Sequence, residues 1–425
     1  MLKGQFPVEK FASLRTPFYY YDLPLLRRTL DKIRECIEPY PQFHVHYAVK
    51  ANFNGRILQE ISRCGFGADC VSGGEVRAAL QNGFAPESIV YAGVGKSDEE
   101  ILLALDAGIA RFNVESAAEL EVINELALSR GVVAPVSLRV NPDIGAHTHA
   151  NITTGLAENK FGINYEQLPG VIELADSLPG VEYKGLHFHI GSQILEMDDF
   201  VALCNRINVL AEQILRQRRG RLVPAASSAA VVGYSSSAVG AAGVSGSGVA
   251  AGVAGTAASV LGDINVGGGL GINYYHPNHL DVAEFSQYFE TFARHLKLPE
   301  GTPVHFELGR SVVAPCGSLI SRVLYIKEGT TRRFAIIDAS MTELIRPALY
   351  KAYHRVENIS SYEPEEVYDV VGPVCESSDV FAKGVSIDKC HRGDFIAIRS
   401  AGAYGESMSS QYNCRPLPAC FFKED

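Results

Sequence analysis

A lysine at the end of a short apolar run is the first residue that could carry chemistry. Lys50 follows the strand-like stretch 44–49, and the loop residues Ala51 and Asn52 come directly after it. Small and apolar neighbours shield an ammonium group from water, which favours the neutral amine that condenses with an aldehyde to form a Schiff base. A surface lysine at a strand end is the alternative, and residues further along the chain must decide between the two.

Charged and flexible residues follow several other predicted strands. The run Gly267 to Gly269 offers backbone N–H groups to a phosphate, although consecutive glycines also form plain turns. Arg310 could bind a phosphate or a carboxylate, and Glu307 could hydrogen-bond a protonated ring nitrogen, unless the two form an ordinary salt bridge. Asp69 and Arg139 would face the same rim, where structural hydrogen bonding is the alternative.

Histidines occur in His-x-His pairs, whose two side chains would share one face of a strand. The pairs are His44/His46, His147/His149 and His187/His189. No further ligands are spaced to complete a metal site, so we expect no metal. His189 could stack on a flat ring, or it could be a hydrogen-bonded core histidine, and Ser192 could reach a phosphate.

The C-terminal part adds a second group of polar side chains. Arg346 and Tyr350 are four residues apart and could hold one carboxylate together if the turn is helical. Cys375, Glu376 and Tyr404 place a thiol, a carboxylate and a phenol in loop-like contexts. Solvated side chains and a structural cysteine are the alternatives.

Short apolar runs alternate with helix-like segments from Tyr19 to Arg310. We count eight runs, at 44–50, 67–71, 89–92, 111–114, 136–141, 185–190, 264–267 and 304–308. Repeated strand–helix units predict a parallel sheet with right-handed crossovers, and eight units favour a closed (β/α)₈ barrel of the α/β class over an open sheet. The polar residues above follow the strands, where the catalytic loops of such a barrel lie.

Two segments depart from this pattern. Residues 220–262 are almost entirely Ala, Gly, Ser and Val, which indicates a low-complexity insertion in a helix-to-strand connection, on the face opposite the chemistry. Residues beyond Arg310 contain short β runs without long helices, which predicts an antiparallel β domain that Phe18 to Asp22 could join. We therefore expect a barrel over 23–315 and a β domain made of 1–22 and 316–425.

Composition limits the function classes. The 425 residues carry a net charge of −10, which argues against nonspecific nucleic-acid binding. Nine cysteines without a C-x-x-C pair suit reduced thiols, and we find neither a signal peptide nor an apolar stretch long enough to span a membrane. We expect a cytoplasmic protein with a small-molecule substrate, without a nucleic-acid or membrane partner.

Taken together, these residues resemble the fold type III pyridoxal-phosphate decarboxylases, most closely the branch that acts on meso-diaminopimelate. The resemblance runs from about Tyr19 to the C-terminus outside the insertion. Its motifs are Tyr47 to Asn52, Ala146 to His149, Thr154-Gly155, Lys160 to Gly162, His189 to Ser192, Gly267 to Gly269, Glu307 to Arg310, Arg346 to Tyr350, Cys375 to Ser377 and Gly402 to Gly405. Each motif is weak alone, but the series in this order is specific.

The resemblance implies pyridoxal 5'-phosphate as cofactor, attached to Lys50, with His189 stacked on its ring and Glu307 keeping the pyridine nitrogen protonated. The implied cofactor-binding residues are Lys50, Asp69, Arg139, His189, Ser192, Gly267, Gly268, Gly269, Glu307, Gly309, Arg310 and Tyr404. The implied substrate-binding residues are Arg310, Arg346, Tyr350, Glu376 and Tyr404. Cys375, from the second subunit of a homodimer, would return a proton after carbon dioxide leaves.

The chain departs from the family pattern in its insertion and in Glu307-Leu308-Gly309-Arg310, where the family usually has a proline in second place. Decarboxylases of ornithine, arginine or carboxynorspermidine are alternatives. Arg310 and Arg346 argue against the first two, because a purely basic substrate tail would face like charges. A racemase fits less well, since nothing marks a tyrosine base opposite the lysine. A single-barrel cofactor-holding regulator would not need the C-terminal β region with Cys375 and Tyr404.

Overall fold

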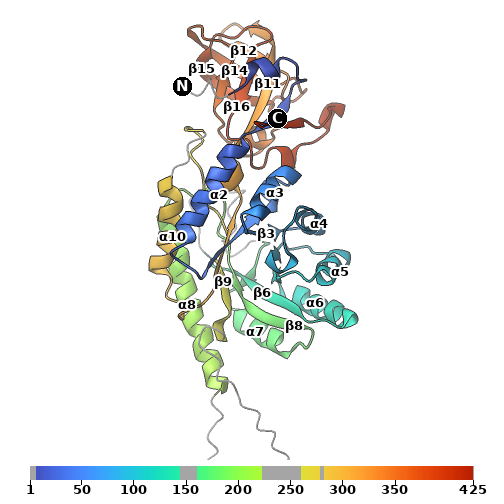
Figure 1. Ribbon diagram of the computed structural model, residues 1–425, viewed down its shortest axis with the longest axis vertical. Helices are drawn as coiled ribbons and strands as arrows, with labels where there is room; N and C mark the ends of the chain where they lie inside the picture. The colour runs from blue at the N-terminus through green and yellow to red at the C-terminus, as the bar shows by residue number, and fades with distance from the viewer. Residues whose placement is uncertain (1–5, 144–159, 223–259, 278–281, 425) are drawn as a thin grey trace, which may run out of the picture.

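The computed structural model describes residues 6–143, 160–222, 260–277 and 282–424, drawn in colour in Figure 1. Several predictions lie outside these residues: the His147/His149 pair, Thr154-Gly155 and most of the insertion. At the edges of that insertion, helix α8 (Met197–Leu222) continues to its last described residue. On the other side of the insertion, the next barrel strand is β9 (Asp263–Asn265).

The predicted strand–helix repeat forms a closed barrel. Within the described residues, one sheet has the strand order β5-β4-β3-β2-β10-β9-β8-β6-β7, and pairing between β5 and β6 closes it. The barrel strands are β2 (Phe43–Ala48), β3 (Gly67–Cys70), β4 (Ile89–Tyr91), β5 (Arg111–Val114), β6 (Ala134–Asn141), β8 (Val181–His187), β9 and β10 (Val304–Leu308). All their pairings are parallel, which confirms the eight predicted runs and the barrel. The short β7 (Ile163–Asn164) is added at β6.

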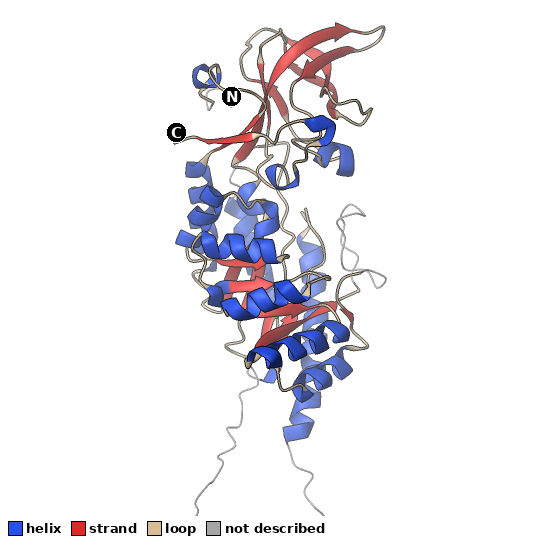
Figure 2. Cartoon of the chain, turned by 90° about the vertical axis from the view of Figure 1, so that its right-hand side faces the viewer, coloured by secondary structure: helices blue, strands red, loops and turns tan. Residues whose placement is uncertain are grey.

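Helices cover the outside of the barrel (Figures 1 and 2). They are α2 (Leu23–Ile37), α3 (Gly55–Arg63), α4 (Gly73–Gln81), α5 (Asp98–Ala107), α6 (Ala117–Arg130), α7 (Leu168–Ser177), α8 and α10 (Val282–His295). Three of them begin with the same local device, a serine N-cap followed by glutamate at the third helical position. The pairs are Ser72–Glu75, Ser97–Glu100 and Ser116–Glu119, and each serine accepts a hydrogen bond from the backbone N–H of its glutamate.

A second sheet lies at one end of the molecule, above the barrel in Figure 1. Its strands are β1 (Phe18–Tyr21), β11 (Gly317–Glu328), β12 (Arg333–Ile337), β13 (Val356–Asn358), β14 (Glu365–Val371), β15 (Val380–Asp388), β16 (Phe395–Ile398) and β17 (Ala419–Phe422). Short helices α1 (Val8–Phe11), α11 (Arg310–Val313) and α12 (Arg346–Tyr350) flank or connect these strands.

The second sheet corrects one expectation. Most of its pairs are antiparallel, but β1 pairs with β17 and β12 pairs with β14 in parallel, so the sheet is mixed. Both parallel pairs join strands with other sheet strands between them in sequence, an arrangement that local turn signals cannot reveal. The predicted N-terminal strand is confirmed, because β1 also pairs with β11. The boundaries at 22/23 and 315/316 stay a prediction.

The loops of the second sheet meet the barrel at the segment that carries Lys50. Asn52 donates hydrogen bonds to Tyr21 Oη at 2.8 Å and to the Gly402 carbonyl at 2.9 Å. The Tyr404 N–H donates to the Ala51 carbonyl at 2.8 Å. The second sheet therefore fixes one wall of the barrel's open end.

Candidate functional site

A cavity of about 390 Å³ opens at the carboxyl ends of the barrel strands. Ten of the residues predicted for the site line it: Lys50, Asp69, Arg139, His189, Ser192, Glu307, Arg310, Arg346, Tyr350 and Tyr404. Gly269 and Gly309 line a smaller adjoining cavity of about 60 Å³, together with Ser192 and Arg310. The barrel residues among them meet because parallel strands end at one rim, whereas Arg346, Tyr350 and Tyr404 come from α12 and a loop of the second sheet.

Lys50 lies in a 3₁₀ turn, Val49–Ala51, that begins where β2 ends. Its Nζ is 3.9 Å from Oδ2 of Asp69 on β3, and neither oxygen of Asp69 accepts a hydrogen bond within the described residues. Burial lowers the pKa of Lys50, but the charges of Asp69, Tyr404 and Glu307 outweigh burial and raise it. The expectation of a neutral amine produced by desolvation is therefore wrong for the free protein, because sequence neighbours do not include the acid contributed by β3.

The pKa of Asp69 is also raised in this environment. Burial and the negative charge of Glu307 raise the pKa of this carboxyl well above its usual range, against the opposing charge of Lys50. The amine and the acid therefore compete for one proton at the base of the cavity. Transfer of that proton to Asp69 would leave Lys50 in the nucleophilic form.

Glu307 is held ionised by neighbours from three other strands. His187 Nε2 donates to its carboxylate at 3.2 Å, and Asn265 Nδ2 donates at 2.8 Å. Asn113 Nδ2 lies 3.5 Å away. Burial would raise the pKa of Glu307, but the charge and hydrogen bond of His187 and the charge of Lys50 hold it well below its usual range. A charged acceptor is thus fixed in the cavity wall.

His189 is neutral in this site. Burial and the positive charges of Lys50 and Arg139 lower its pKa well below the usual range. The Gly268 N–H donates to His189 Nδ1 at 3.2 Å, so the ring proton belongs on Nε2. A neutral imidazole with a fixed tautomer can lie against a flat ring without adding charge.

The glycine turn differs in detail from the expected phosphate cradle. The Gly267 N–H already donates to Asn265 Oδ1 and the Gly268 N–H to His189, which leaves Gly269 as the glycine of the run whose N–H has no acceptor within the described residues. Gly267 and Gly269 have positive φ values of 72° and 116°. A Cβ on Gly268 would lie 1.8 Å from the Glu307 carbonyl oxygen, so the turn must be glycine for its strands to approach.

Two buried guanidinium groups, those of Arg310 and Arg346, also line the cavity. Arg310 donates to Ser192 Oγ at 2.9 Å and lies 4.9 Å from the centre of the Tyr404 ring. Arg346 begins α12, whose last residue is Tyr350. Neither arginine forms an ion pair within the described part of the chain, although each is at most 6% exposed. Such a pair of guanidinium groups would bind an anionic ligand.

Two predicted residues lie outside this cavity. Cys375 is exposed, and its N–H is 3.4 Å from Asn413 Oδ1. Glu376 accepts a hydrogen bond from Tyr412 Oη at 2.7 Å. The chain's own cavity therefore does not include the thiol or this acid.

Several residues of the site were not predicted. Glu115 follows β5 and accepts a hydrogen bond from Arg139 at 2.6 Å, and Phe161 lies 4.7 Å below the same guanidinium. Asn113 and Asn265 could have been suspected, since each is a polar amide next to apolar residues in a short predicted strand. His187 had been weighed only as a metal ligand, and Tyr274 gave no signal. Of the other pairs, His46 does not line the cavity, and its Nε2 lies 3.0 Å from His305 Nδ1.

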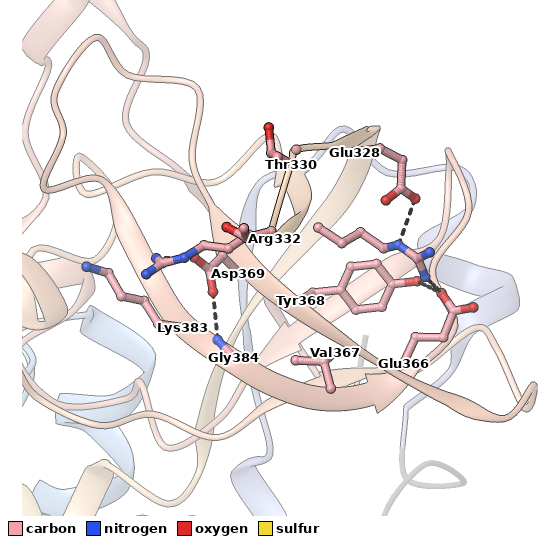
Figure 3. Close-up of a pocket in the computed structure, with 12 residues that line it drawn as sticks. Glu328, Thr330, Arg332, Glu366, Val367, Tyr368, Asp369, Lys383 and Gly384 are labelled. Atoms are coloured by element: carbon pink, nitrogen blue, oxygen red, sulfur yellow. Dashed lines mark hydrogen bonds and ion pairs between the residues drawn. The ribbon is translucent and has the colours of Figure 1, made fainter.

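A second concavity of about 820 Å³ lies in the β sheet, between β12, β14 and β15 (Figure 3). Its charged groups neutralise one another: Arg332 pairs with Asp369 at 3.1 Å, and Arg333 pairs with Glu366. Asp369 also accepts from the Gly384 N–H at 2.7 Å. This concavity is larger than the barrel cavity, but its arginines are paired with carboxylates. We therefore place the candidate active site in the barrel.

Comparisons of the sequence and of the structure with known proteins point to the same family. The family profile described as "Pyridoxal-dependent decarboxylase, pyridoxal binding domain" matches residues 26–218. Diaminopimelate decarboxylase of Bacteroides thetaiotaomicron is 54% identical over 424 residues, which cover 100% of both chains. The chain belongs to the diaminopimelate decarboxylase family. The family's enzyme from Zymomonas mobilis is 37% identical over 96% of this chain and 87% of its own.

Solved structures of the family share the fold. The crystal structure of the Helicobacter pylori diaminopimelate decarboxylase complexed with L-lysine has a TM-score of 0.81 and 34% identity, covering 98% of this chain and 93% of that one. These relationships confirm the fold, the enzyme class and a pyridoxal-phosphate cofactor.

The residues present fit that cofactor. The cavity holds an amine, a buried ionised acid and a neutral imidazole, together with two orphaned oxygens on Asp69. The smaller cavity offers the open N–H of Gly269 beside Ser192 and Arg310, a donor set suited to a phosphate. None of the described helices is long and apolar enough to cross a membrane.

Replacing Asp69 with asparagine tests the control of Lys50. The charge of Asp69 raises the pKa of Lys50, whereas burial lowers it. Without that charge the pKa of Lys50 should fall, by about one unit or more for an opposite charge at this distance. The apoprotein should then take up pyridoxal phosphate faster at neutral pH, and the pH of half-maximal uptake rate should move down. Stopped-flow absorbance over a pH series measures this.

Asp369→Asn is the matched control, since it removes a buried carboxylate far from the cavity and should leave the profile unchanged. An Asp69→Asn profile that stays in place or moves to higher pH would contradict the account.

Proposed function

We propose that the protein decarboxylates meso-2,6-diaminopimelate to L-lysine with pyridoxal 5'-phosphate, the last step of lysine biosynthesis. The observation that carries this is the pair of buried guanidiniums, Arg310 and Arg346, in the same cavity as Lys50. An amine together with two guanidiniums that form no ion pair within the described residues suits a substrate with a reacting amino acid group and a distant carboxylate. When bound, the cofactor accepts the electrons of the broken carbon–carbon bond.

Lys50 would hold the cofactor covalently through Nζ, with Asp69 controlling its proton. Glu307 would accept a hydrogen bond from the pyridine nitrogen and keep that nitrogen protonated, a role supported by its lowered pKa. His189 would lie against the ring. Arg139, held by Glu115, would line the same wall.

The phosphate would bind in the smaller cavity. Ser192, Gly269 and Gly309 line it, and Arg310 borders both cavities. Gly267 and Gly268 would act indirectly, since their N–H groups hold Asn265 and His189. The phosphate group would therefore be bound mainly by backbone and hydroxyl donors.

Arg310, Arg346 and Tyr350 would bind the far carboxylate of the substrate. Tyr404, which also borders the cofactor pocket, would complete the far subsite with Glu376 and recognise the amino group there. A decarboxylase of ornithine or arginine is the alternative, but a tail ending in a cation would face two guanidiniums. Carboxynorspermidine carries a carboxylate, and a substrate assay separates it.

Release of carbon dioxide should be measured from meso-diaminopimelate, ornithine, arginine and carboxynorspermidine with the purified holoenzyme. We expect release from meso-diaminopimelate, with lysine formed in equal amount, and negligible release from ornithine and arginine. Preference for any of the other three would refute the proposal.

The location and domain structure are part of the proposal. All nine cysteines are free thiols, which supports a reducing compartment, and we propose the cytoplasm. We also propose a barrel domain over 23–315 and a β domain formed by 1–22 and 316–425. The strand membership of the two sheets supports this division.

We further propose a homodimer with shared active sites. Cys375 and Glu376 lie outside their own chain's cavity, which supports their acting in the partner's cavity. There Cys375 would return the proton after decarboxylation.

Mixing two inactive variants, Lys50→Ala and Cys375→Ala, tests this arrangement. Each mixed dimer would contain one site with both residues intact, so an equal mixture after subunit exchange should regain roughly a quarter of wild-type activity. Cys414→Ala, an exposed cysteine beside Asn413, serves as the control and should stay active. If the mixture gains nothing while the subunits demonstrably exchange, the two residues serve the same chain's site.

A further inference from the structure

Tyr274 lies behind the two cavity arginines and touches both of them. Its phenol oxygen accepts a hydrogen bond from Arg310 at 2.8 Å and from Arg346 at 2.9 Å. The residue is 8% exposed and is not among the described residues that line the cavity. It therefore reaches a bound substrate only through the guanidiniums.

Two buried guanidinium groups that share one acceptor repel each other. At the distances imposed by that acceptor their charges interact strongly, because little water screens them. The positive charge of Arg310 adds to burial in lowering the pKa of Arg346. The Tyr274 hydroxyl accepts a hydrogen bond from both groups and so holds them close together.

The remaining contacts fix each arginine from its other side. Arg310 also donates to Ser192 Oγ. Arg346 donates to His354 Nε2 at 2.8 Å, and His354 Nδ1 donates to the Arg399 carbonyl at 2.9 Å, which defines a neutral tautomer. Burial and the charge of Arg346 lower the pKa of His354 to about 3, so this acceptor persists at every working pH.

The Tyr274 ring also packs against Arg346 and against His354, the histidine that accepts a hydrogen bond from Arg346. The Arg346 guanidinium lies 5.2 Å from the centre of the Tyr274 ring, and the Tyr274 and His354 rings meet edge to face at 5.1 Å. One atom, the Tyr274 hydroxyl oxygen, hydrogen-bonds both arginines. Its position thus determines how far apart and at what angle their free N–H groups face the cavity.

We propose that Tyr274 is a positioning residue that sets the spacing of Arg310 and Arg346, and through it the recognition of the substrate's far carboxylate. This inference rests on the proposed function, because it names the residue that makes the proposed carboxylate subsite selective. Removing the hydroxyl lets the guanidiniums separate, so a carboxylate no longer meets both in register.

Tyr274→Phe removes the hydroxyl and keeps the ring. We expect the KM for meso-diaminopimelate to rise by about tenfold or more, since hydrogen bonds to two charged groups are lost, while kcat changes by less than about threefold. Inhibition by L-lysine, which keeps one carboxylate, should weaken in parallel. Inhibition by cadaverine, the same chain without a carboxylate, and the visible absorbance of the bound cofactor should stay as in the wild type.

Tyr288→Phe is the matched control. Tyr288 on α10 is fully buried, and its hydroxyl has no hydrogen-bond partner among the described residues, so its removal should change neither KM nor inhibition by lysine. This control separates loss of any buried hydroxyl from loss of the bridging one.

Three outcomes would overturn the inference: an unchanged KM, a fall in kcat alone, or equal weakening of lysine, cadaverine and cofactor binding. The last would mean that Tyr274 supports the fold rather than the subsite. A wild-type enzyme without activity on meso-diaminopimelate would instead refute the proposed function, so the two failures are distinguishable.

Discussion

The buried carboxylate of Glu307 is the interaction on which the rest of the site depends. An acid enclosed in a barrel would ordinarily take up a proton, since burial penalises its charge. Here hydrogen bonds from His187 and Asn265, at 3.2 and 2.8 Å, keep it ionised. The donors come from β8 and β9, so the closed barrel itself supplies the stabilisation.

That fixed negative charge lies in a cavity that also holds cationic groups. Glu307 and Asp69 both contribute to the ammonium character of Lys50. Arg310 and Arg346 add two buried guanidinium groups to the same cavity. Arg346 and Tyr404 belong to the second sheet's connections, so substrate selectivity is built by the β region and cofactor chemistry by the barrel. A substrate with separated amine and carboxylate groups matches this combination of charges.

Much of this arrangement follows from local sequence. The eight barrel strands could be predicted because apolar runs alternate with helix-like segments, and Lys50, Glu307 and Arg310 could be singled out because they lie at or just after the ends of predicted strands. The glycine turn was recognisable, yet two of its N–H groups serve Asn265 and His189, which only the fold reveals. The partial parallel pairing of the second sheet depends on strands distant in sequence.

Other features depend on contacts that no local pattern encodes. The direction of the Lys50 pKa depends on Asp69 from a neighbouring strand. Tyr274 lies in a loop without periodicity, and its importance arises because α12 brings Arg346 to the same oxygen. His354 could be read from the sequence only as one more histidine. In each case the function belongs to a pair or cluster, and the sequence shows its members separately.

The protonation state of the cofactor's pyridine nitrogen tests the central claim most directly. The measurement is the ¹⁵N chemical shift of ring-labelled pyridoxal phosphate bound to the wild-type enzyme and to Glu307→Gln. An ionised Glu307 predicts a protonated nitrogen in the wild type and an unprotonated one in the variant. An unprotonated nitrogen in the wild type, or the same shift in both proteins, would contradict the account.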